Sequence, residues 1–403
     1  MRPSLFALTL GAFALGTTEF VIVGLLPTIA ADLGVSVPSL GTLVAVYAVG
    51  IAIGGPLLTT ATARLGRRPV LLATLLAFVA ANALAGLAPT YAVLFAARLV
   101  GGAAHGLFFS LATVVAPGLV APEQRGRAVA AVFGGLTLAT VLGVPFGTLL
   151  GAQLGWRAAF AGVVVLGAAA VAAIIAFVPR VAAPPALPLA TQLAVLRRRP
   201  VVLTLTLTAL LTAGDFTAFT YLVPFLGEVT GVRGSAVTAV LLAFGVATVA
   251  GNFLGGRGAD HNVTRTLVLS IATLGTALLG LFLLGDIPAL AIACVMLWAT
   301  ASFAFIPAVH CRILTLGGDV ADIASSLDIS AFNVGIALGA AIGGLVVGTG
   351  SVRAVALVGA VIAAGALVLV LATRTAAADA SAVASAEEPG VEAFEHVPAA
   401  AAA

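Results

Sequence analysis

The sequence contains no lysine and few charges of either sign. All 18 basic residues of the 403-residue chain are arginine, only 8% of the residues are charged, and 62% are hydrophobic. A soluble domain carries about 25% charged residues, so this chain cannot cover a water-facing surface and lipid is its expected solvent. Without lysine the chain has no phosphate-binding P-loop, which excludes ATP-driven transport by this chain alone.

Cysteine is scarce as well. Cys294 and Cys311 are the two in the sequence, and both lie in or beside one apolar stretch, so neither a disulfide framework nor a zinc spacing follows. No HExxH, haem or nucleotide motif occurs, so we expect no metal and no cofactor. The arginines are dispersed over short loops, which gives no indication of a nucleic-acid partner.

Long apolar runs are what the sequence has in abundance. The run from Leu5 to Ala31 is longer than a signal-peptide core and lacks a convincing cleavage site, so it is interpreted as a membrane span and not as a cleaved signal. A spanning helix needs about 20 apolar residues. Breaks at charges, prolines and glycine clusters predict twelve spans, at residues 5–31, 39–62, 70–89, 92–120, 128–152, 158–178, 201–226, 235–256, 265–285, 288–314, 324–348 and 352–373.

The longest linker divides these spans into two sets of six. We expect an N-terminal six-helix bundle at 1–178, a cytoplasmic linker at 179–200 with four prolines and three consecutive arginines, and a C-terminal bundle at 201–374. The tail at 375–403 is rich in alanine and glutamate and is predicted to be disordered.

Arginine placement predicts the orientation. Alternate loops and both termini hold fourteen arginines, the other loops hold Arg157, Arg233 and Arg353, and Arg98 lies inside a span. Because cytoplasmic loops are enriched in basic residues, both termini are predicted to lie in the cytoplasm of a bacterial cell, with the chain in the inner membrane.

The two halves match at a constant offset of 197 residues. The matching pairs are Pro27 with Pro224, Gly34 with Gly231, Val35 with Val232, Gly54 with Gly251, Arg68 with Arg265, Gly147 with Gly344 and Gly151 with Gly348. Either the matches are a coincidence of an apolar composition, or the halves are duplicated bundles, which suits a transporter whose halves rock about a midplane site.

Four stretches carry a family resemblance. They are GAFALGTTEFVIVGLLPTIAADLGVS at 11–36, ARLGRRP at 63–69, RLVGGAAHG at 98–106 and GVPFGTLLG with GWRAAF at 143–160. The chain resembles the major facilitator superfamily over residues 5–373, in its twelve-span drug:proton antiporter branch, which includes chloramphenicol-resistance, arabinose-related efflux and purine-nucleoside export proteins. The resemblance implies an all-α membrane fold of two pseudo-symmetric six-helix bundles and transport by alternating access.

The chain departs from the family signatures at two places. In the first-loop signature G-x-x-x-D-R-x-G-R-R, Thr59 replaces the glycine and Ala63 replaces the aspartate, while Asp260 stands at the position equivalent to Ala63 in the second half. The charge latch attributed to that aspartate cannot operate in the first half. In the fifth span Val144 separates Gly143 from Pro145, which are adjacent in the antiporter signature.

Ionisable side chains at membrane depth are expensive and are therefore candidates for function. Glu19 and Asp215 each lie about 14 residues, or about 20 Å, into a span from the cytoplasmic edge, and Arg98 enters from the other side to a similar level. Burial favours a neutral carboxyl and a nearby arginine favours the ionised form. We expect Glu19 or Asp215 to take up the transported proton beside Arg98; alternatively, Arg98 binds an acid or backbone carbonyls only to stabilise the bundle.

Several side chains are candidates for substrate binding. Rings near Asp215 would suit amphipathic, aromatic or neutral solutes. His105, two turns from Arg98, either titrates or binds substrate, or it packs between helices; Asn333 either binds substrate or joins helices. The predicted substrate-binding residues are His105, Phe216, Phe219, Tyr221 and Asn333.

A further set is expected to act in gating. The small residues of the fifth span are expected at the interface between the halves, with Pro145 bending the helix, or else in ordinary tight packing. The loop arginines either anchor the chain to the membrane or clamp helix ends, and Asp260 is expected to accept such a contact. The predicted gating residues are Arg64, Gly66, Arg67, Arg68, Gly143, Pro145, Gly147, Gly151 and Asp260.

The sequence therefore predicts a proton-coupled exporter of small drug-like molecules, with chloramphenicol among the candidates, acting as a monomer in the bilayer and not as an enzyme. Export of nucleosides, sugars or other metabolites, or uptake, stays open because cargo depends on side chains that converge from several helices. A membrane-embedded enzyme or a channel is the alternative of a different class. It would need clustered catalytic groups or a pore-lining charge ring, and the sequence has neither pattern.

Overall fold

The computed structural model describes residues 2–121, 124–180, 194–317 and 321–386, and its regular structure is helical throughout those ranges. In chain order the elements are α1 (Pro3–Leu33), α2 (Val37–Ala61), α3 (Arg67–Gly86), α4 (Tyr91–Gly118), α5 (Arg125–Leu138), the π-helical turn η2 (Ala139–Gly143), α6 (Val144–Leu154), α7 (Trp156–Phe177), η3 (Val195–Arg197), α9 (Arg199–Phe219), α10 (Leu222–Glu228), α11 (Ser235–Leu284), α12 (Pro288–Gly317), α13 (Ala321–Gly348) and α14 (Ala354–Ala386).

Eleven helices within the described ranges are long and apolar enough to cross a membrane. One of them, α11, has 50 residues, and Asn262 within it has φ −161° and ψ 101°, which is not helical. A continuous helix of that length would measure about 75 Å against a hydrocarbon core of about 30 Å. It is therefore two spans joined at Asn262, and the predicted twelve-span all-α fold is confirmed.

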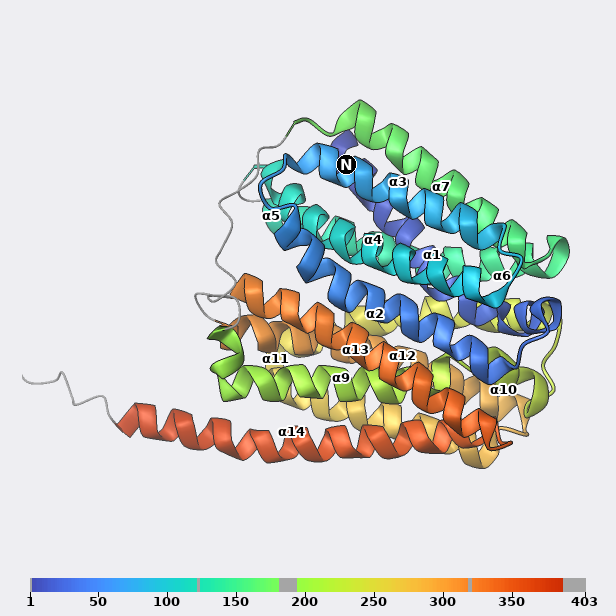
Figure 1. Cartoon of the computed structure of the whole chain (residues 1–403). Coiled ribbons are helices and arrows are strands. Elements are labelled where there is room, and N and C mark those ends of the chain that lie inside the picture. The colour runs from blue at the N-terminus through green and yellow to red at the C-terminus, as the bar shows by residue number, and fades with distance from the viewer. Residues whose placement is uncertain (1, 122–123, 181–193, 318–320, 387–403) are drawn as a thin grey trace, which may run out of the picture.

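The helices form two bundles, with α1 to α7 on one side of the molecule and α9 to α14 on the other (Figure 1). The predicted linker at 179–200 lies largely outside the described residues, since 181–193 are not among them. Helix α14 continues to Ala386, so residues 375–386 are helical although the composition predicted disorder, and 387–403 lie outside the described residues. Ala-rich sequence favours helix once a preceding span has nucleated it.

The repeat at offset 197 has structural counterparts. Gly34 and Gly231 both have positive φ, of 64° and 77°, and each follows the first span of its half, where glycine adopts the left-handed conformation without steric cost. A Cβ on Gly54 would meet Ala103, and a Cβ on Gly251 would meet Thr300, which is the equivalent of Ala103. In each half, the second and fourth helices thus cross at the equivalent glycine of the second helix.

The fifth span is a broken helix made of α5, η2 and α6. Pro145 lies in the first turn of α6 and has no N–H to donate to the preceding turn, and the wider π turn of Ala139–Gly143 comes directly before it. Proline and π turns are two established causes of helix distortion. The predicted irregularity therefore takes the form of a π turn followed by Pro145.

The two bundles contact each other at one end of the molecule and near its centre. We call the end where α1 and α9 begin and α2 passes into α3 the arginine-rich end. At the opposite end the Tyr221 hydroxyl donates to the carbonyl of Ala340 at 3.2 Å, within its own half, and to that of Pro38 at 3.5 Å, in the other half. Nearer the centre, a Cβ on Gly245 of α11 would lie 2.7 Å from Cα of Val141 in η2.

Candidate functional site: two buried acids

A charged cluster lies inside the first bundle, formed by Glu19 of α1, Tyr47 of α2, and Arg98 and His105 of α4. All four side chains are buried, with Arg98 only 2% exposed. The cluster forms because glycines let these helices approach closely: a Cβ on Gly102 would touch the carbonyl of Tyr47. Four polar side chains are thereby held at membrane depth without contact with bulk water.

Arg98 binds the backbone rather than the acid. Its guanidinium donates to the carbonyls of Thr18 at 2.7 Å, Leu43 at 3.2 Å and Glu19 at 3.5 Å, and its carbon lies 3.9 Å from the centre of the Tyr47 ring. The five donors of a guanidinium suit several acceptors at once. This is the backbone-binding alternative considered for Arg98, and it fixes the backbone of α1 at the acid.

The Glu19 carboxylate instead faces His105. Its Oε2 atom lies 3.7 Å from Nδ1 of His105, and the same nitrogen lies 3.1 Å from the Tyr47 hydroxyl. On the other side of α1, the Thr18 hydroxyl donates to Asn82 of α3 at 2.5 Å. Glu19, His105 and Tyr47 thus form one buried polar cluster, with a hydrogen bond between His105 and Tyr47 and the Glu19 carboxylate beside them.

Asp215 of α9 forms the second buried acid site, in the other bundle. Its Oδ1 atom accepts from Nε1 of Trp298 at 2.5 Å and from the Ser302 hydroxyl at 2.6 Å, both on α12. The Asp215 residue is 7% exposed, and no arginine or histidine of the described residues forms an ion pair with it. It is a buried carboxyl held by two neutral donors.

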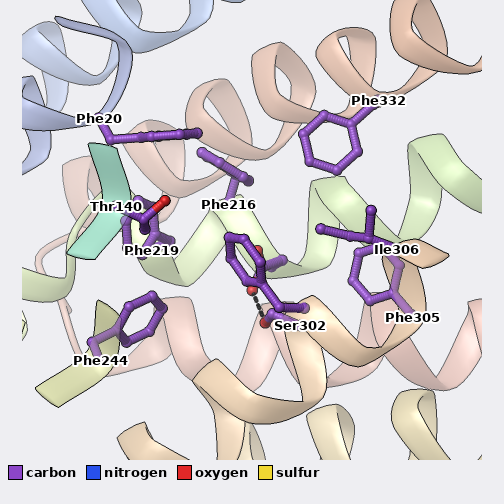
Figure 2. Close-up of a pocket in the computed structure, with 11 residues that line it drawn as sticks. Phe20, Thr140, Phe216, Phe219, Phe244, Ser302, Phe305, Ile306 and Phe332 are labelled. Carbon is purple, nitrogen blue, oxygen red and sulfur yellow. Dashed lines mark hydrogen bonds between the residues drawn. The ribbon is translucent and has the colours of Figure 1, made fainter. Parts of the chain in front are cut away.

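Asp215 lines a small cavity between the bundles (Figure 2). Phe20 and Thr140 come from the first half, and the remaining lining side chains, which include Ser302, come from the second: Phe216, Phe219, Phe244, Phe303, Phe305, Ile306 and Phe332. The cavity measures about 30 Å³, which is room for a water molecule or two. Drug-sized ligands occupy roughly 300–1,000 Å³, so such a solute enters only when the halves move apart.

The two acid sites occupy equivalent places in the repeat. Ser302, which donates to Asp215, is the equivalent of His105, which faces Glu19, at the offset of 197. Asp215 is the equivalent of Thr18, the residue next to Glu19. Each half thus joins its first helix to its fourth through one acid and one polar partner, and the halves differ in the chemistry around that pair.

The predicted substrate-binding residues divide into two groups. Phe216 and Phe219 line the cavity. His105, Tyr221 and Asn333 do not. His105 belongs to the charged cluster, and Tyr221 joins the two halves. Asn333 donates to Ile329 one turn away, and its buried Oδ1 has no partner in the described ranges.

The first-loop residues do not form a clamp in this conformation. Arg64 and Asp260 are exposed, and within the described part of the chain neither forms an ion pair, so the expected contact of Asp260 with an arginine is not seen among these residues. Arg68 donates to the carbonyl of Ile175 in its own half at 2.5 Å. Arg67 is buried at the start of α3, its Nε and Nη1 have no hydrogen-bond partner among the residues that the structure describes, and Gly66 is the N-cap of that helix.

The expectation that the fifth-span glycines lie between the halves is wrong for Gly143, Gly147 and Gly151. A Cβ on each would strike Thr17, Val21 or Leu25 of α1, in the same bundle. Spacing of four places these glycines on one helix face, but spacing does not say which neighbour that face meets. The glycines that meet the other half are Gly41, Gly245 and Gly344.

Sequence reasoning missed most partners of the acids. Tyr47, Trp298, Ser302, Phe20 and Thr140 contact the two sites, and none was predicted. Ser302 was within reach, since it is the equivalent of His105 in the repeat. The others carried no signal, because an aromatic or hydroxyl side chain in an apolar span does not reveal which way it points. Within the described ranges, no three His, Cys, Asp or Glu side chains lie close enough to hold a metal ion.

Two membrane-spanning bundles that close on a central cavity, with a buried acid in each, define a membrane transporter. The chain belongs to the Major Facilitator Superfamily, whose family model matches residues 8–321.

Similar proteins agree with this assignment. The chain is 39% identical over 368 residues to the inner membrane transport protein YdhP of Escherichia coli K12, covering 91% of this chain and 94% of that protein. It is 35% identical over 343 residues to a chloramphenicol resistance protein of Streptomyces lividans, covering 84% and 88%. The solved structure of a D-xylose-proton symporter has a TM-score of 0.76 over 91% of this chain and 96% of that one, at 16% identity, which supports the fold alone.

Proposed function

We propose that this protein is a proton-coupled exporter of small, drug-like molecules that works by alternating access in a bacterial inner membrane, with both termini in the cytoplasm. The observation that carries the proposal is Asp215, a buried carboxyl with no ion-pair partner in the described chain, on the wall of an aromatic cavity between the two halves. A site between two related bundles is what a rocking mechanism requires.

The cavity suggests the class of substrate. Seven of its eleven lining residues are phenylalanine, Ile306 is the other apolar one, and Asp215, Ser302 and Thr140 are polar. Aromatic walls with a few polar groups suit flat, amphipathic molecules. Chloramphenicol fits this description, and a relative at 35% identity is a chloramphenicol resistance protein.

The two acids provide the coupling. A carboxyl that is buried in one conformation and hydrated in another changes its affinity for protons as the protein moves. In this conformation both acids are buried, and the halves touch at the end opposite the arginine-rich end. Opening one end at a time would expose Asp215 to proton and substrate from one side and then from the other.

Susceptibility tests check the cargo. An efflux-deficient bacterial host expressing the protein should tolerate more chloramphenicol than the same host with an empty vector. A proton ionophore should raise the accumulation of radiolabelled chloramphenicol in the expressing cells to the empty-vector level. Protection against nucleoside analogues or toxic sugar analogues, without protection against chloramphenicol, would assign a different cargo; no protection with the protein present in the membrane would reject the proposal.

Replacing an acid by its amide tests the coupling. Glu19→Gln keeps the shape of the side chain but cannot release a proton, so gradient-driven efflux should fall to the empty-vector level while the protein stays in the membrane; Asp215→Asn is tested in the same way. Asp286→Asn is the matched control, because Asp286 is 62% exposed at the far end and pairs with Arg353. Unchanged efflux in both amide variants would reject proton coupling through these acids.

A further inference from the structure

A third acid, Asp328 of α13, lies buried outside both sites. The Asp328 residue is 8% exposed, and its Oδ1 atom accepts a hydrogen bond of 2.6 Å from the Thr208 hydroxyl of α9. Asp328 is seven residues into α13, or about 10 Å from the start of that helix at the arginine-rich end. A carboxyl at such depth is expensive unless it has a function or a partner.

Helix α9 connects Asp328 with Asp215 through one polar face. Thr204, Thr208, Thr212 and Asp215 follow one another at spacings of four, four and three residues, so they lie on the same side of the helix. The three threonines are at most 1% exposed. Thr208 and Asp215 are seven residues apart, which is about 10 Å along the helix, and the Thr212 hydroxyl between them donates to the carbonyl of Thr208 at 2.8 Å.

The cavity approaches Asp328 from the other side. Phe332, one helical turn after Asp328, lines the cavity on the side of Phe305 and Ile306 (Figure 2). Toward the arginine-rich end, an apolar cluster of Val195, Val201, Ile313 and Ala324 covers the base of α9 and α13. Asp328 therefore lies between the cavity and this apolar cluster.

Two described arginines on elements near Asp328 bind other groups. On α12, Arg312 donates to the Thr373 hydroxyl at 3.1 Å, and before α9, Arg198 donates to the carbonyl of Gly317 at 3.0 Å. His310 of α12 is partly buried, and α2, which packs on α13 from the other half, has Tyr47 as its one titratable side chain. Among the described residues, no cation lies within ion-pair distance of the Asp328 carboxyl.

We propose that Asp328 is a proton-relay residue that passes the coupled proton between Asp215 and the arginine-rich side of the membrane. The inference rests on the proposed function. In the relay the O–H bond of one carboxylic acid breaks, the proton crosses through the Thr208 hydroxyl and intervening water, and an O–H bond forms on the other carboxylate. One acid is neutralised as the other ionises, so no further reactant is required.

The first experiment needs no substrate. Infrared difference spectra of the protein in lipid nanodiscs, recorded as pH is changed, should contain a carboxylic-acid C=O band that disappears in Asp328→Asn and persists in Asp286→Asn. Because acids that share a proton titrate as a coupled pair, the midpoint of the Asp328 band should move in Asp215→Asn. An unchanged spectrum in Asp328→Asn, or an unmoved midpoint in Asp215→Asn, overturns the relay.

The second experiment separates relay from packing. In inside-out vesicles, Asp328→Asn should lose at least about tenfold of chloramphenicol-driven proton movement yet keep chloramphenicol counterflow within about twofold, because counterflow needs no net proton transfer and the amide still accepts the Thr208 hydrogen bond. Asp328→Glu should restore the proton movement. If Asp328→Asn loses proton movement and counterflow to the same extent, Asp328 has a packing role. If it keeps both activities, Asp328 has no role in transport and the relay is rejected. Absence of proton movement in the unmodified protein contradicts the proposed function instead.

Discussion

At the scale of single residues, Arg98 shows how a buried charge can be satisfied without a counter-ion. Its guanidinium binds three carbonyls on α1 and α2 and stacks on Tyr47. Hydrogen bonds to charged groups contribute about 1.5–3 kcal/mol each. Lysine has a compact charge and cannot reproduce the planar fork, so the arrangement depends on arginine in particular.

Arg98→Lys should therefore lower the stability of the first bundle. Losing one or two of these bonds predicts a loss of about 3 kcal/mol, visible as a lower midpoint of thermal unfolding in detergent. Arg64→Lys is the control, because Arg64 is exposed and should leave the midpoint unchanged. If Arg98→Lys unfolds at the original temperature but no longer transports chloramphenicol, the charge acts in transport rather than in stability.

The sequence located the buried acids and Arg98 because charge at membrane depth stands out in an apolar chain. It could not predict that Arg98 would turn to the backbone of α1, because that depends on how glycines such as Gly102 set the helix spacing. Asp215 gave no sign of Trp298, which lies more than 80 residues further along the chain. The depth of a residue in the membrane can be predicted from its place along one span, whereas its side-chain contacts depend on where the neighbouring helices lie.

At the scale of helices, glycines decide how closely two elements approach. The fifth-span stripe was predicted correctly as a small-residue face, but that face packs on α1 within its own bundle. Near the centre of the molecule, the halves touch at Gly245 of α11, where a Cβ would lie 2.7 Å and 2.8 Å from backbone atoms of Val141 and Thr140. Backbone atoms cannot rotate away as side chains can, so a larger residue at position 245 would force the two helices apart.

Gly245→Val should push the halves apart in this closed conformation. Overpacking costs about 1–3 kcal/mol, and 1.4 kcal/mol changes an equilibrium tenfold, so the transport rate should fall about tenfold at similar protein levels. A reporter Phe20→Cys, in a chain with Cys294 and Cys311 replaced by serine, should react faster with an impermeant thiol reagent.

Gly256→Val supplies the comparison for this test. Gly256 is also in α11, and a Cβ there meets no atom within 4 Å, so transport and labelling should match the parent. Equal effects of the two valines would show that helix propensity, rather than the contact with η2, is responsible.

At the scale of the whole molecule, the sequence predicted the architecture well because its signals are long and repeated. Twelve apolar runs, alternating arginines and matches such as Gly54 with Gly251 all indicate the same pair of bundles. The second-half spans predicted at 235–256 and 265–285 are the two parts of α11 on either side of Asn262. The span boundaries were less accurate, since the first span, predicted at 5–31, is Pro3–Leu33. Hydropathy locates the part of a helix that crosses the membrane, whereas local hydrogen bonding sets the residues at which the helix begins and ends.

Whether the halves separate at the end opposite the arginine-rich end can be tested by joining them there. A Cβ on Gly344 would lie 3.2 Å from the carbonyl oxygen of Pro38, in the other half, so these two positions are close enough for a crosslink in this conformation. Pro38→Cys with Gly344→Cys, in the cysteine-free background, should form a disulfide on oxidation and stop transport, and a reducing agent should restore it.

Each single cysteine controls for the substitution itself and should transport under both conditions. Because alternating access requires this end to open once in every cycle, a covalent bond across it permits substrate to enter from only one side. Full transport by a completely crosslinked protein would mean that α2 and α13 stay together throughout the cycle, and the moving interface would then have to be sought around α11 and η2.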